Sequence, residues 1–234
     1  MKKIFNLLPV LFISAFTNAG IFLETSVSMT DTDVDSLKFL NPIGKAATSN
    51  TTTGNFINLQ NHNQNNQDNG RSFKIGLDYS GFDIYLTQKS FGSASATGTA
   101  TFSSFVFTQK LMLDIDVLAL GISYPFNIGG KHSIAPLIEI GQADIDVTGH
   151  QINPAGNFTN FPLKSIDDST FSYGLSYAYE MTDDVNLTVA YIVNDLGDAN
   201  TGVTGTGIAG MNAGEQLQSD LEVSELTFGL KLNF

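Results

Sequence analysis

The sequence predicts an all-β protein, an eight-stranded antiparallel up-and-down transmembrane β-barrel. From Gly20 onward, apolar residues recur at every second position in segments of about ten residues, which is the period of a β-strand. The connections between these segments alternate between long and short. Only 15% of the residues are charged, although the mean hydropathy is near zero at +0.04. Strands with one face in hydrocarbon explain both values. Charge is costly on that face, and the polar residues of the other face bring the mean hydropathy of the chain close to zero.

Composition excludes several other classes of protein. The 234 residues suit one large domain or two small ones. A net charge of −12 argues against a nucleic-acid partner, because phosphates require a basic surface. The absence of cysteine excludes disulfides and thiolate metal sites.

The N-terminal segment 1–19 has the pattern of a secretory signal peptide. Lys2 and Lys3 precede an apolar run from Ile4 to Phe16, and Ala19 precedes Gly20. The run is shorter than the roughly 20 residues that a membrane-spanning helix needs. We therefore expect cleavage near Ala19 and a barrel domain over residues 20–234. Loss of Lys2 and Lys3 would change the net charge from −12 to −14.

The alternation is clearest in the segment from Ser169 to Met181, in which bulky Phe, Tyr and Leu residues alternate with Ser, Gly and Ala. The next alternating segment starts after Thr182 to Val185, which predicts a tight hairpin. The eight predicted strands are Ile21 to Met29, Phe73 to Ser80, Phe82 to Lys89, Leu111 to Tyr124, Lys131 to Val147, Ser169 to Met181, Leu187 to Val193 and Asp220 to Phe234.

The lengths of the connections distinguish an up-and-down barrel from a β-sandwich. The predicted long connections are Thr30 to Ser72, Ser90 to Lys110, Thr148 to Asp168 and Asp195 to Ser219; the short ones are Gly81, Pro125 to Gly130 and Thr182 to Val185. A sandwich gives no reason for every second connection to be long. Outer-membrane barrels have short periplasmic turns and long extracellular loops, so an even strand number places both ends in the periplasm.

The chemistry of the two faces predicts which one points inward. An eight-stranded barrel has an interior just wide enough for side chains, so small and polar groups belong inside and bulky apolar groups face lipid. Aromatic residues beside the short turns predict an interfacial girdle, although the chain has no tryptophan. These residues are Tyr79, Phe82, Tyr124, Phe126, Tyr177 and Tyr179.

The C-terminal segment alternates Leu226, Phe228, Leu230 and Leu232 with smaller or polar residues and stops at Phe234. It resembles the terminal strand of Gram-negative outer-membrane proteins, the signal read by the barrel-assembly machinery. The chain is thus similar to small eight-stranded barrels of the outer membrane protein A, OmpX, OmpW and opacity-protein types. The resemblance implies a monomer in the outer membrane, in contact with its lipids and lipopolysaccharide. The resemblance rests on architecture, and the chain matches no functional motif of these families.

Charged residues on the inward positions lie in the predicted lumen: Glu24, Lys74, Asp78, Asp83, Lys89, Asp114, Asp116, Glu139, Glu180, Glu225 and Lys231. They could form an ion pathway. A paired, hydrated interior is favoured, because eight strands leave little open bore. With eight acids against three bases, we expect repulsion to raise the pKa of some carboxyl groups.

The facing of the segment Leu111 to Tyr124 stays open at this point. If Asp114 and Asp116 face inward, so do Leu118, Leu120 and Ile122, unless a β-bulge resets the register. An apolar patch in the lumen would suit passage of small hydrophobic molecules, as in the OmpW type. The favoured interpretation is local core packing.

Asp31, Asp33 and Asp35 have the spacing that opens a calcium-binding EF-hand loop. The EF-hand is excluded, because Ser36 and Pro42 occupy the positions that require Gly and a bidentate Glu. Loose binding of divalent cations and a solvated acidic loop are the two remaining interpretations, and the second is favoured.

The three histidines are His62, His132 and His150. Some outer-membrane barrels modify lipid A with a histidine, a serine and an acid, so His150 with a nearby serine is the candidate for catalysis. No motif fixes its partners, and an exposed loop histidine is the favoured interpretation. We therefore assign no catalytic, cofactor-binding or metal-binding residue.

Two segments are expected to form extracellular loops, because their composition cannot bury a core. Asn50 to Asn69 is rich in Asn and Gln, and Asp195 to Ser219 is rich in Gly, Thr and Ala. The sequence thus predicts a non-enzymatic barrel with a structural or surface-interaction role through four long loops. The alternatives are a narrow OmpW-like channel for small hydrophobic or cationic solutes and a lipid A-modifying enzyme.

Overall fold

The computed structural model describes residues 20–41, 55–102, 105–156, 158–201 and 216–234, and all regular structure in these ranges is β-strand. In this part of the chain no helix is long and apolar enough to cross a membrane. The expected signal peptide and its cleavage site near Ala19 lie outside the described residues.

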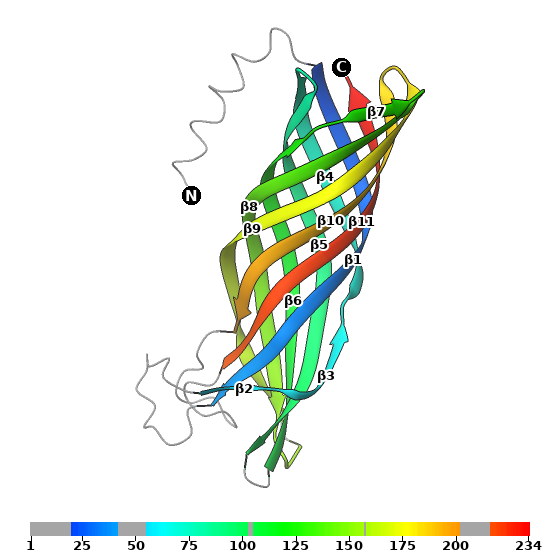
Figure 1. The fold of residues 1–234 in the computed structure, drawn as a ribbon. Helices are drawn as coiled ribbons and strands as arrows, with labels where there is room; N and C mark the ends of the chain where they lie inside the picture. The colour runs from blue at the N-terminus through cyan, green and yellow to red at the C-terminus, as the bar shows by residue number, and fades with distance from the viewer. Residues whose placement is uncertain (1–19, 42–54, 103–104, 157, 202–215) are drawn as a thin grey trace, which may run out of the picture.

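Eight long strands form a closed antiparallel barrel, as predicted (Figure 1). They are β1 (Gly20–Asn41), β4 (Gln67–Tyr79), β5 (Phe82–Phe102), β6 (Phe105–Ser123), β8 (His132–Ile152), β9 (Phe158–Thr182), β10 (Val185–Asn200) and β11 (Gln216–Asn233). Each pairs with the next, and β11 pairs with β1. Three short strands, β2 (Asn55–Asn58), β3 (Gln60–Asn65) and β7 (Phe126–Gly129), pair with β1, β5 and β8.

The barrel closes where the first and last strands meet. Their ladder runs from Phe22 opposite Asn233 to Leu40 opposite Gln216. Beyond it, the Ile21 and Phe234 backbones exchange hydrogen bonds of 3.3 and 2.8 Å. Closure leaves neither strand with an open edge, as a bilayer requires.

Short turns join the strands at the end of the barrel that also holds the start of β1 and the C-terminus, here called the turn end (Figure 1). Ser80 and Gly81 form a two-residue hairpin loop between the paired Tyr79 and Phe82. Both loop residues have positive φ, 56° and 87°, as a type I′ turn requires. The predicted hairpin between β9 and β10 is confirmed, with Thr182 paired to Val185.

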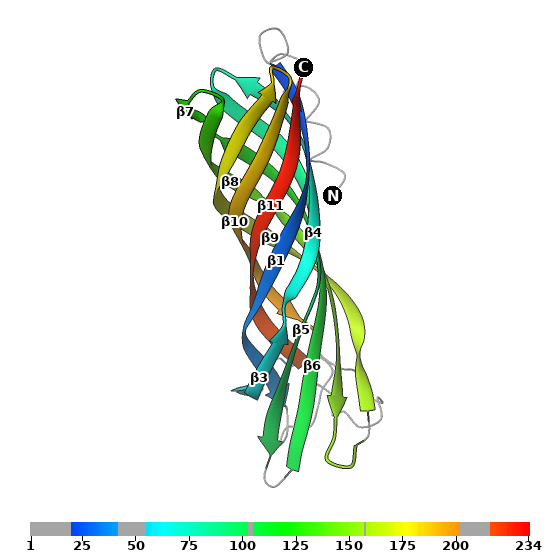
Figure 2. The same cartoon turned by 90° about the vertical axis from the view of Figure 1, so that its right-hand side faces the viewer.

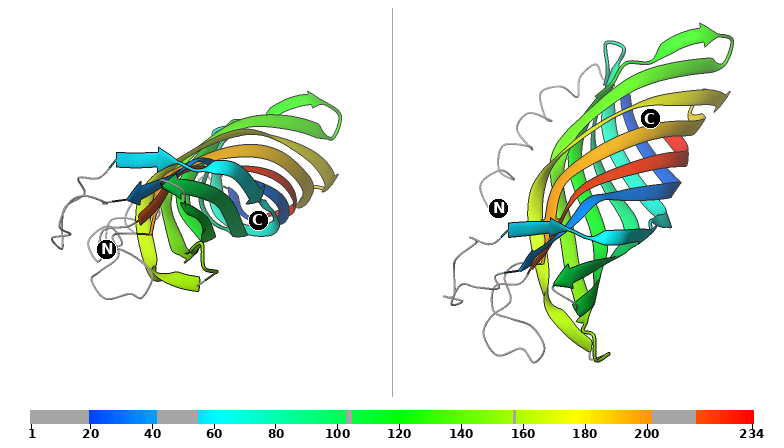
Figure 3. Two further views of the ribbon diagram at one scale, coloured as in Figure 1. Left: turned by 90° about the horizontal axis from the view of Figure 1, so that it is seen from below. Right: turned by 60° about the horizontal axis from the view of Figure 1, so that its bottom comes forward.

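The opposite end, here called the hairpin end, differs from the prediction of four long loops. β5 and β6 stay paired from Ser90–Asp116 to Phe102–Phe105, so the predicted connection Ser90 to Lys110 is mostly a strand hairpin. β8 and β9 likewise remain paired up to Ile152–Phe158. Figures 2 and 3 show these strands projecting at this end. The loop prediction was wrong because small residues such as those of Ser93–Thr99 hide a continuing strand period.

The two loop segments chosen by composition are also partly strand. Within Asn50 to Asn69, residues 55–58, 60–65 and 67–69 belong to β2, β3 and β4, whereas 50–54 lie outside the described residues. Within Asp195 to Ser219, β10 continues to Asn200 and β11 begins at Gln216. Pairing with long neighbouring strands supplies the hydrogen bonds that the polar composition did not predict.

The outer surface of the turn-end half is apolar, as predicted. Exposed large side chains such as Phe73, Ile140, Tyr173 and Phe228 cover it. The aromatic girdle is confirmed beside the short turns, where the Tyr124 ring lies 4.7 Å from Phe82 and 4.5 Å from Phe126, between centroids.

Toward the hairpin end, the outward face of the strands changes from apolar to acidic. Asp114 and Asp116 point outward and are exposed, so their predicted lumen position was wrong. Leu118, Leu120 and Ile122 share their face and point outward as well. No bulge interrupts β6 in its ladder with β8. The same face of β6 therefore points outward along the whole strand. It carries apolar residues toward the turn end and aspartates toward the hairpin end.

A buried apolar core fills the barrel at the hairpin end. Its members come from seven of the eight long strands; they include Val34, Phe91, Ile115, Ile145, Phe161, Leu196 and Val223. The apolar lumen patch considered at Leu118, Leu120 and Ile122 was therefore wrong, because these residues point outward. The β6 residues in the core are those that alternate with Asp114 and Asp116. The barrel is lipid-facing in one half and resembles a water-soluble barrel in the other.

Candidate functional site

The lumen contains a charged network at the junction of the two halves. The Lys89 Nζ of β5 lies 2.6 Å from Glu139 Oε2 of β8 and 2.6 Å from Glu225 Oε1 of β11. It also donates a 3.0 Å hydrogen bond to Asn194 Oδ1 of β10. The Tyr85 hydroxyl donates to Glu139 Oε1 at 3.0 Å. Four strands are thus tied together across the interior.

All of these side chains are buried, so their charges are desolvated. Burying an ion costs several kcal/mol unless partners and hydrogen bonds offset the loss of water. Here one ammonium faces two carboxylates, and the Tyr85 and Asn194 donors supplement it. The arrangement matches the predicted paired interior.

A polar cavity of about 370 Å³ lies between this network and the turn end. Two ion pairs line it: Lys231 with Asp83 at 2.6 Å, and Lys74 with Glu24 at 4.0 Å. The Lys231 Nζ also lies 4.0 Å from the Phe22 ring centroid, a cation–π contact. The other two predicted lumen acids, Asp78 and Glu180, belong to this end: Asp78 lines the cavity, and Glu180 is half-buried opposite Asn186.

The apolar core closes the lumen on the other side of the network. The Lys89 Nζ lies 5.9 Å from the Phe91 ring centroid, so charge gives way directly to apolar side chains. Phe91, Ile115, Ile145 and Leu196 are each at most 1% exposed. A hydrated ion entering from the turn end would meet a desolvated layer that offers it no ligands.

A belt of carboxylates lies on the outside of the barrel just beyond the apolar band, on β6, β8, β9, β10, β11 and β1. Asp116, Asp144 and Asp167 are direct neighbours across β6, β8 and β9. Burial raises the pKa of Asp144, and so do the charges of Asp167, Asp146 and Asp116. Mutual repulsion of acids was predicted for the lumen, and here it raises the pKa of an acid on the outer surface.

The belt continues on the other side of the barrel. Asp195 of β10 is paired with Glu222 of β11, which is paired with Asp33 of β1. One step further from the membrane band, Asp198 lies opposite Asp220, and a hydrogen bond between the two carboxyl groups raises the pKa of Asp198. These outward acids occupy positions that are apolar in the other half of the same strands.

The predicted catalytic and metal candidates are not brought together. His150 lies in β8 opposite Lys110 and Asn160, and burial together with the Lys110 charge lowers its pKa. His132 lies in the girdle, 2.6 Å from the Tyr177 hydroxyl. The side chain of His62 is outside the described residues.

Asp31 and Asp33 both point outward from β1, whereas the Asp35 side chain is not described. Among the described side chains, no three His, Asp or Glu residues could hold a metal ion.

The sequence placed Lys89, Glu139 and Glu225 in the lumen, but their mutual contact was not predicted. The apolar core was not predicted either, because both features join distant strands. One signal was available: Leu113–Val117 and Ala143–Val147 both alternate aspartate with aliphatic residues. In the structure these segments are direct partners, with Ile115 opposite Ile145. Acids alternating with branched aliphatic residues are typical of a strand with one face in water.

Comparison with solved structures finds outer-membrane barrels. OprG from Pseudomonas aeruginosa is 13% identical, with a TM-score of 0.51 over 92% of this chain and 96% of OprG. The Escherichia coli outer membrane protease OmpT is 10% identical, with a TM-score of 0.49 over 93% and 98% of the two chains. Neisserial surface protein A is 10% identical, with a TM-score of 0.41 over 92% and 97%.

No protein-family model matches the chain, and no curated protein matches it. The likeness to OprG shows the fold, an outer-membrane β-barrel. One fold can carry many unrelated functions, so the fold by itself assigns no activity.

Proposed function

We propose that this chain is an integral outer-membrane barrel with a structural or surface-interaction role and a lumen that does not conduct. The observation that supports it is the closure of the lumen by the Lys89 network and the apolar core beyond it. In this arrangement the turn end faces the periplasm, and the hairpin end projects outside the cell.

The surroundings of the barrel follow from this orientation. Outer-membrane lipids and lipopolysaccharide surround the apolar band as its partners. The barrel-assembly machinery reads the alternating C-terminal strand that ends at Phe234. The acidic belt, which continues the same strands outside the band, is suited to surface contacts and disfavours nucleic acid as a partner.

Planar-bilayer recording of the purified barrel tests the closed lumen. We expect no steady openings, because the apolar core offers an ion no replacement for its hydration shell. A variant that carries Asp116→Asn on the outer face serves as the matched control and should behave identically. Steady, single-level openings of the unaltered chain would contradict the proposal and favour the narrow channel.

Two further measurements test the remaining parts of this proposal. Mass spectrometry of the mature chain should show cleavage near Ala19, and light scattering should show a monomer. Mass spectrometry of lipid A, with and without the protein, addresses catalysis. An altered lipid A profile that depends on His150 would replace the structural role with an enzymatic one.

A further inference from the structure

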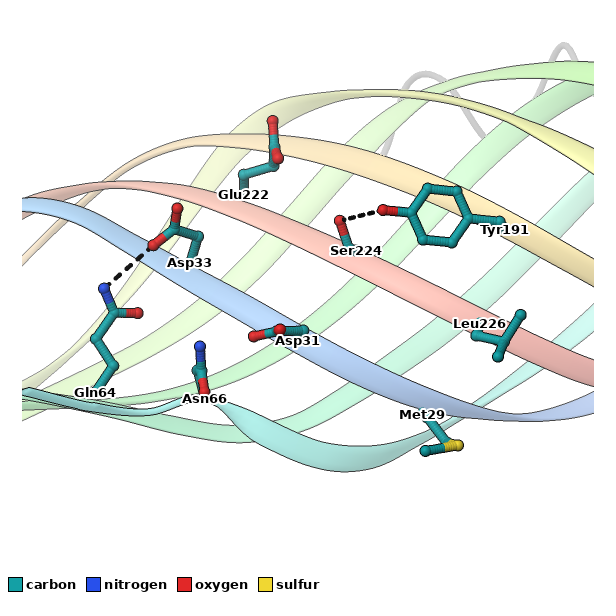
Figure 4. A pocket seen from close by; sticks show the side chains of 9 residues that line it. All are labelled: Met29, Asp31, Asp33, Gln64, Asn66, Tyr191, Glu222, Ser224 and Leu226. Atoms are coloured by element: carbon teal, nitrogen blue, oxygen red, sulfur yellow. Dashed lines mark hydrogen bonds between the residues drawn. The ribbon is translucent and has the colours of Figure 1, made fainter.

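A groove of about 510 Å³ lies on the outside of the barrel where the apolar band meets the acidic belt (Figure 4). It runs over β1 and β11, with Tyr191 of β10 on one side. Gln64 and Asn66, in and just after β3, form the opposite wall. The groove therefore faces the boundary between hydrocarbon and water in the proposed orientation, on which this inference rests.

The part of the groove nearest the turn end is apolar. Met29 and Leu226 are opposite each other in the ladder between β1 and β11, and Met29 is 63% exposed. The Tyr191 ring lies beside them, and its hydroxyl donates to Ser224 Oγ at 3.2 Å. This floor continues the lipid-facing band, so it suits an apolar chain lying along the barrel.

The part nearest the hairpin end is acidic. Asp31 follows Met29 on the same face, and Asp33 stands directly opposite Glu222 in the ladder. In the described part of the chain, no ion pair involves any of these three carboxylates. Like charges directly opposite each other destabilise a sheet, so a bound cation would relieve this pair.

The wall of the groove is fixed by hydrogen bonds. The Val34 amide donates to Gln64 Oε1 at 3.1 Å, and Gln64 Nε2 donates to the Val34 carbonyl at 3.2 Å. The same Nε2 lies 3.1 Å from Asp33 Oδ1, and the Thr32 amide donates to the Asn66 carbonyl at 2.9 Å. The chain after β3 is thereby held against β1, which keeps the groove open on its acidic side.

We propose that this groove binds a cationic amphiphile. The ammonium or guanidinium head group contacts Asp31, Asp33 and Glu222, and the apolar chain lies along Met29 and Leu226. The exposed Tyr191 ring, opposite Leu226 in the ladder between β10 and β11, extends the apolar surface for this chain. A bare metal ion fits less well, because no three acids of the described chain converge as metal ligands.

Methionine-methyl NMR of the full mature barrel in phosphatidylcholine nanodiscs tests the proposal, with dodecylammonium as the probe. We expect a saturable shift of the Met29 methyl signal. Met181, near the turn end, reports nonspecific partitioning and should not saturate. Replacing Asp33 with Asn and Glu222 with Gln should weaken the apparent affinity about tenfold, because the head group loses two charged partners.

The matched control replaces Asp114 and Asp116 with Asn, which removes two outward acids elsewhere in the belt and should leave the affinity unchanged. An equal response to dodecyl sulfate, or an unchanged affinity in the groove variant, would overturn the proposal. Saturation of the Met29 shift by Mg²⁺ alone would overturn it in favour of a metal site. Bilayer recording and heat-modifiable gel mobility report separately on the closed lumen and the barrel itself.

Discussion

Lys89 shows how much of the lumen depends on a single side chain. Its ammonium is the cation nearest to both Glu139 and Glu225, at 2.6 Å from each. A buried ion pair contributes little net stability, whereas removing one partner leaves an uncompensated buried charge. Here the loss of Lys89 would leave two carboxylates facing each other.

We therefore expect Lys89→Met to lower the free energy of unfolding by about 3–5 kcal/mol at neutral pH. Urea unfolding in lipid vesicles, followed by gel mobility of unboiled samples, measures it. Adding Glu139→Gln and Glu225→Gln to the same chain should restore most of the loss. If Lys89→Met alone lowered the free energy of unfolding by less than about 1 kcal/mol, the two buried carboxylates would not depend on Lys89 for their stability.

Asp144 provides a pH-dependent prediction for the outer surface. Burial and the acids around it raise its pKa above the usual 3.8, so the folded chain holds this proton more tightly than the unfolded chain. Stability from this group is then greatest at pH values below 3.8 and falls as the pH rises through the raised pKa. At pH 7 the repulsion with Asp116 and Asp167 is fully present.

Asp144→Asn should thus stabilise the barrel by roughly 0.2–1 kcal/mol at pH 7 and by nothing below pH 3.8. Urea midpoints measured across this pH range test the effect. Asp183→Asn, in the turn between β9 and β10, is the matched control. A gain that does not depend on pH would assign the effect to something other than charge.

At the scale of elements, the β5–β6 hairpin extension is the clearest departure from the loop prediction. Its ladder continues through Ser93–Asp114 and Ala96–Leu111. Ala94, Ala96, Leu111 and Leu113 bury their side chains in the apolar core. An element with a buried face and a full ladder should open rarely.

Hydrogen exchange should accordingly show protection of inter-strand amides in residues 93–97 and 110–114 comparable to that in the turn-end half of β5 and β6. The exposed turn at Ser80 and Gly81 provides the internal reference for fast exchange. Exchange of the extension at the rate of an unstructured loop would contradict the paired hairpin.

At the scale of the whole molecule, the same strand passes through two solvents. In β8, Ile138 and Ile140 face lipid, whereas Asp144 and Asp146 on the same face lie beyond the apolar band. The cost of an outward charge should therefore depend on its height along the strand.

Ile138→Arg should destabilise the barrel by about 2–4 kcal/mol in lipid vesicles, because the charge enters hydrocarbon. Asp146→Arg, eight residues along the same strand and on the same face, should change stability by less than about 0.5 kcal/mol. Equal costs at the two positions would show that the apolar band does not end where the acidic belt begins.

The sequence by itself determined the eight long strands of the barrel, the tight hairpin at Thr182–Val185, the aromatic girdle and the inward position of Lys89. These features follow from local periodicity and turn chemistry. Only the tertiary structure decided that Asp114 and Asp116 face outward, that the long connections continue as strands, and that Lys89 meets both Glu139 and Glu225.

The physical reason is that alternation reports which residues share a face but not which solvent that face meets. That solvent changes with height along the barrel, and the height of each residue is set by the register of all eight strands together.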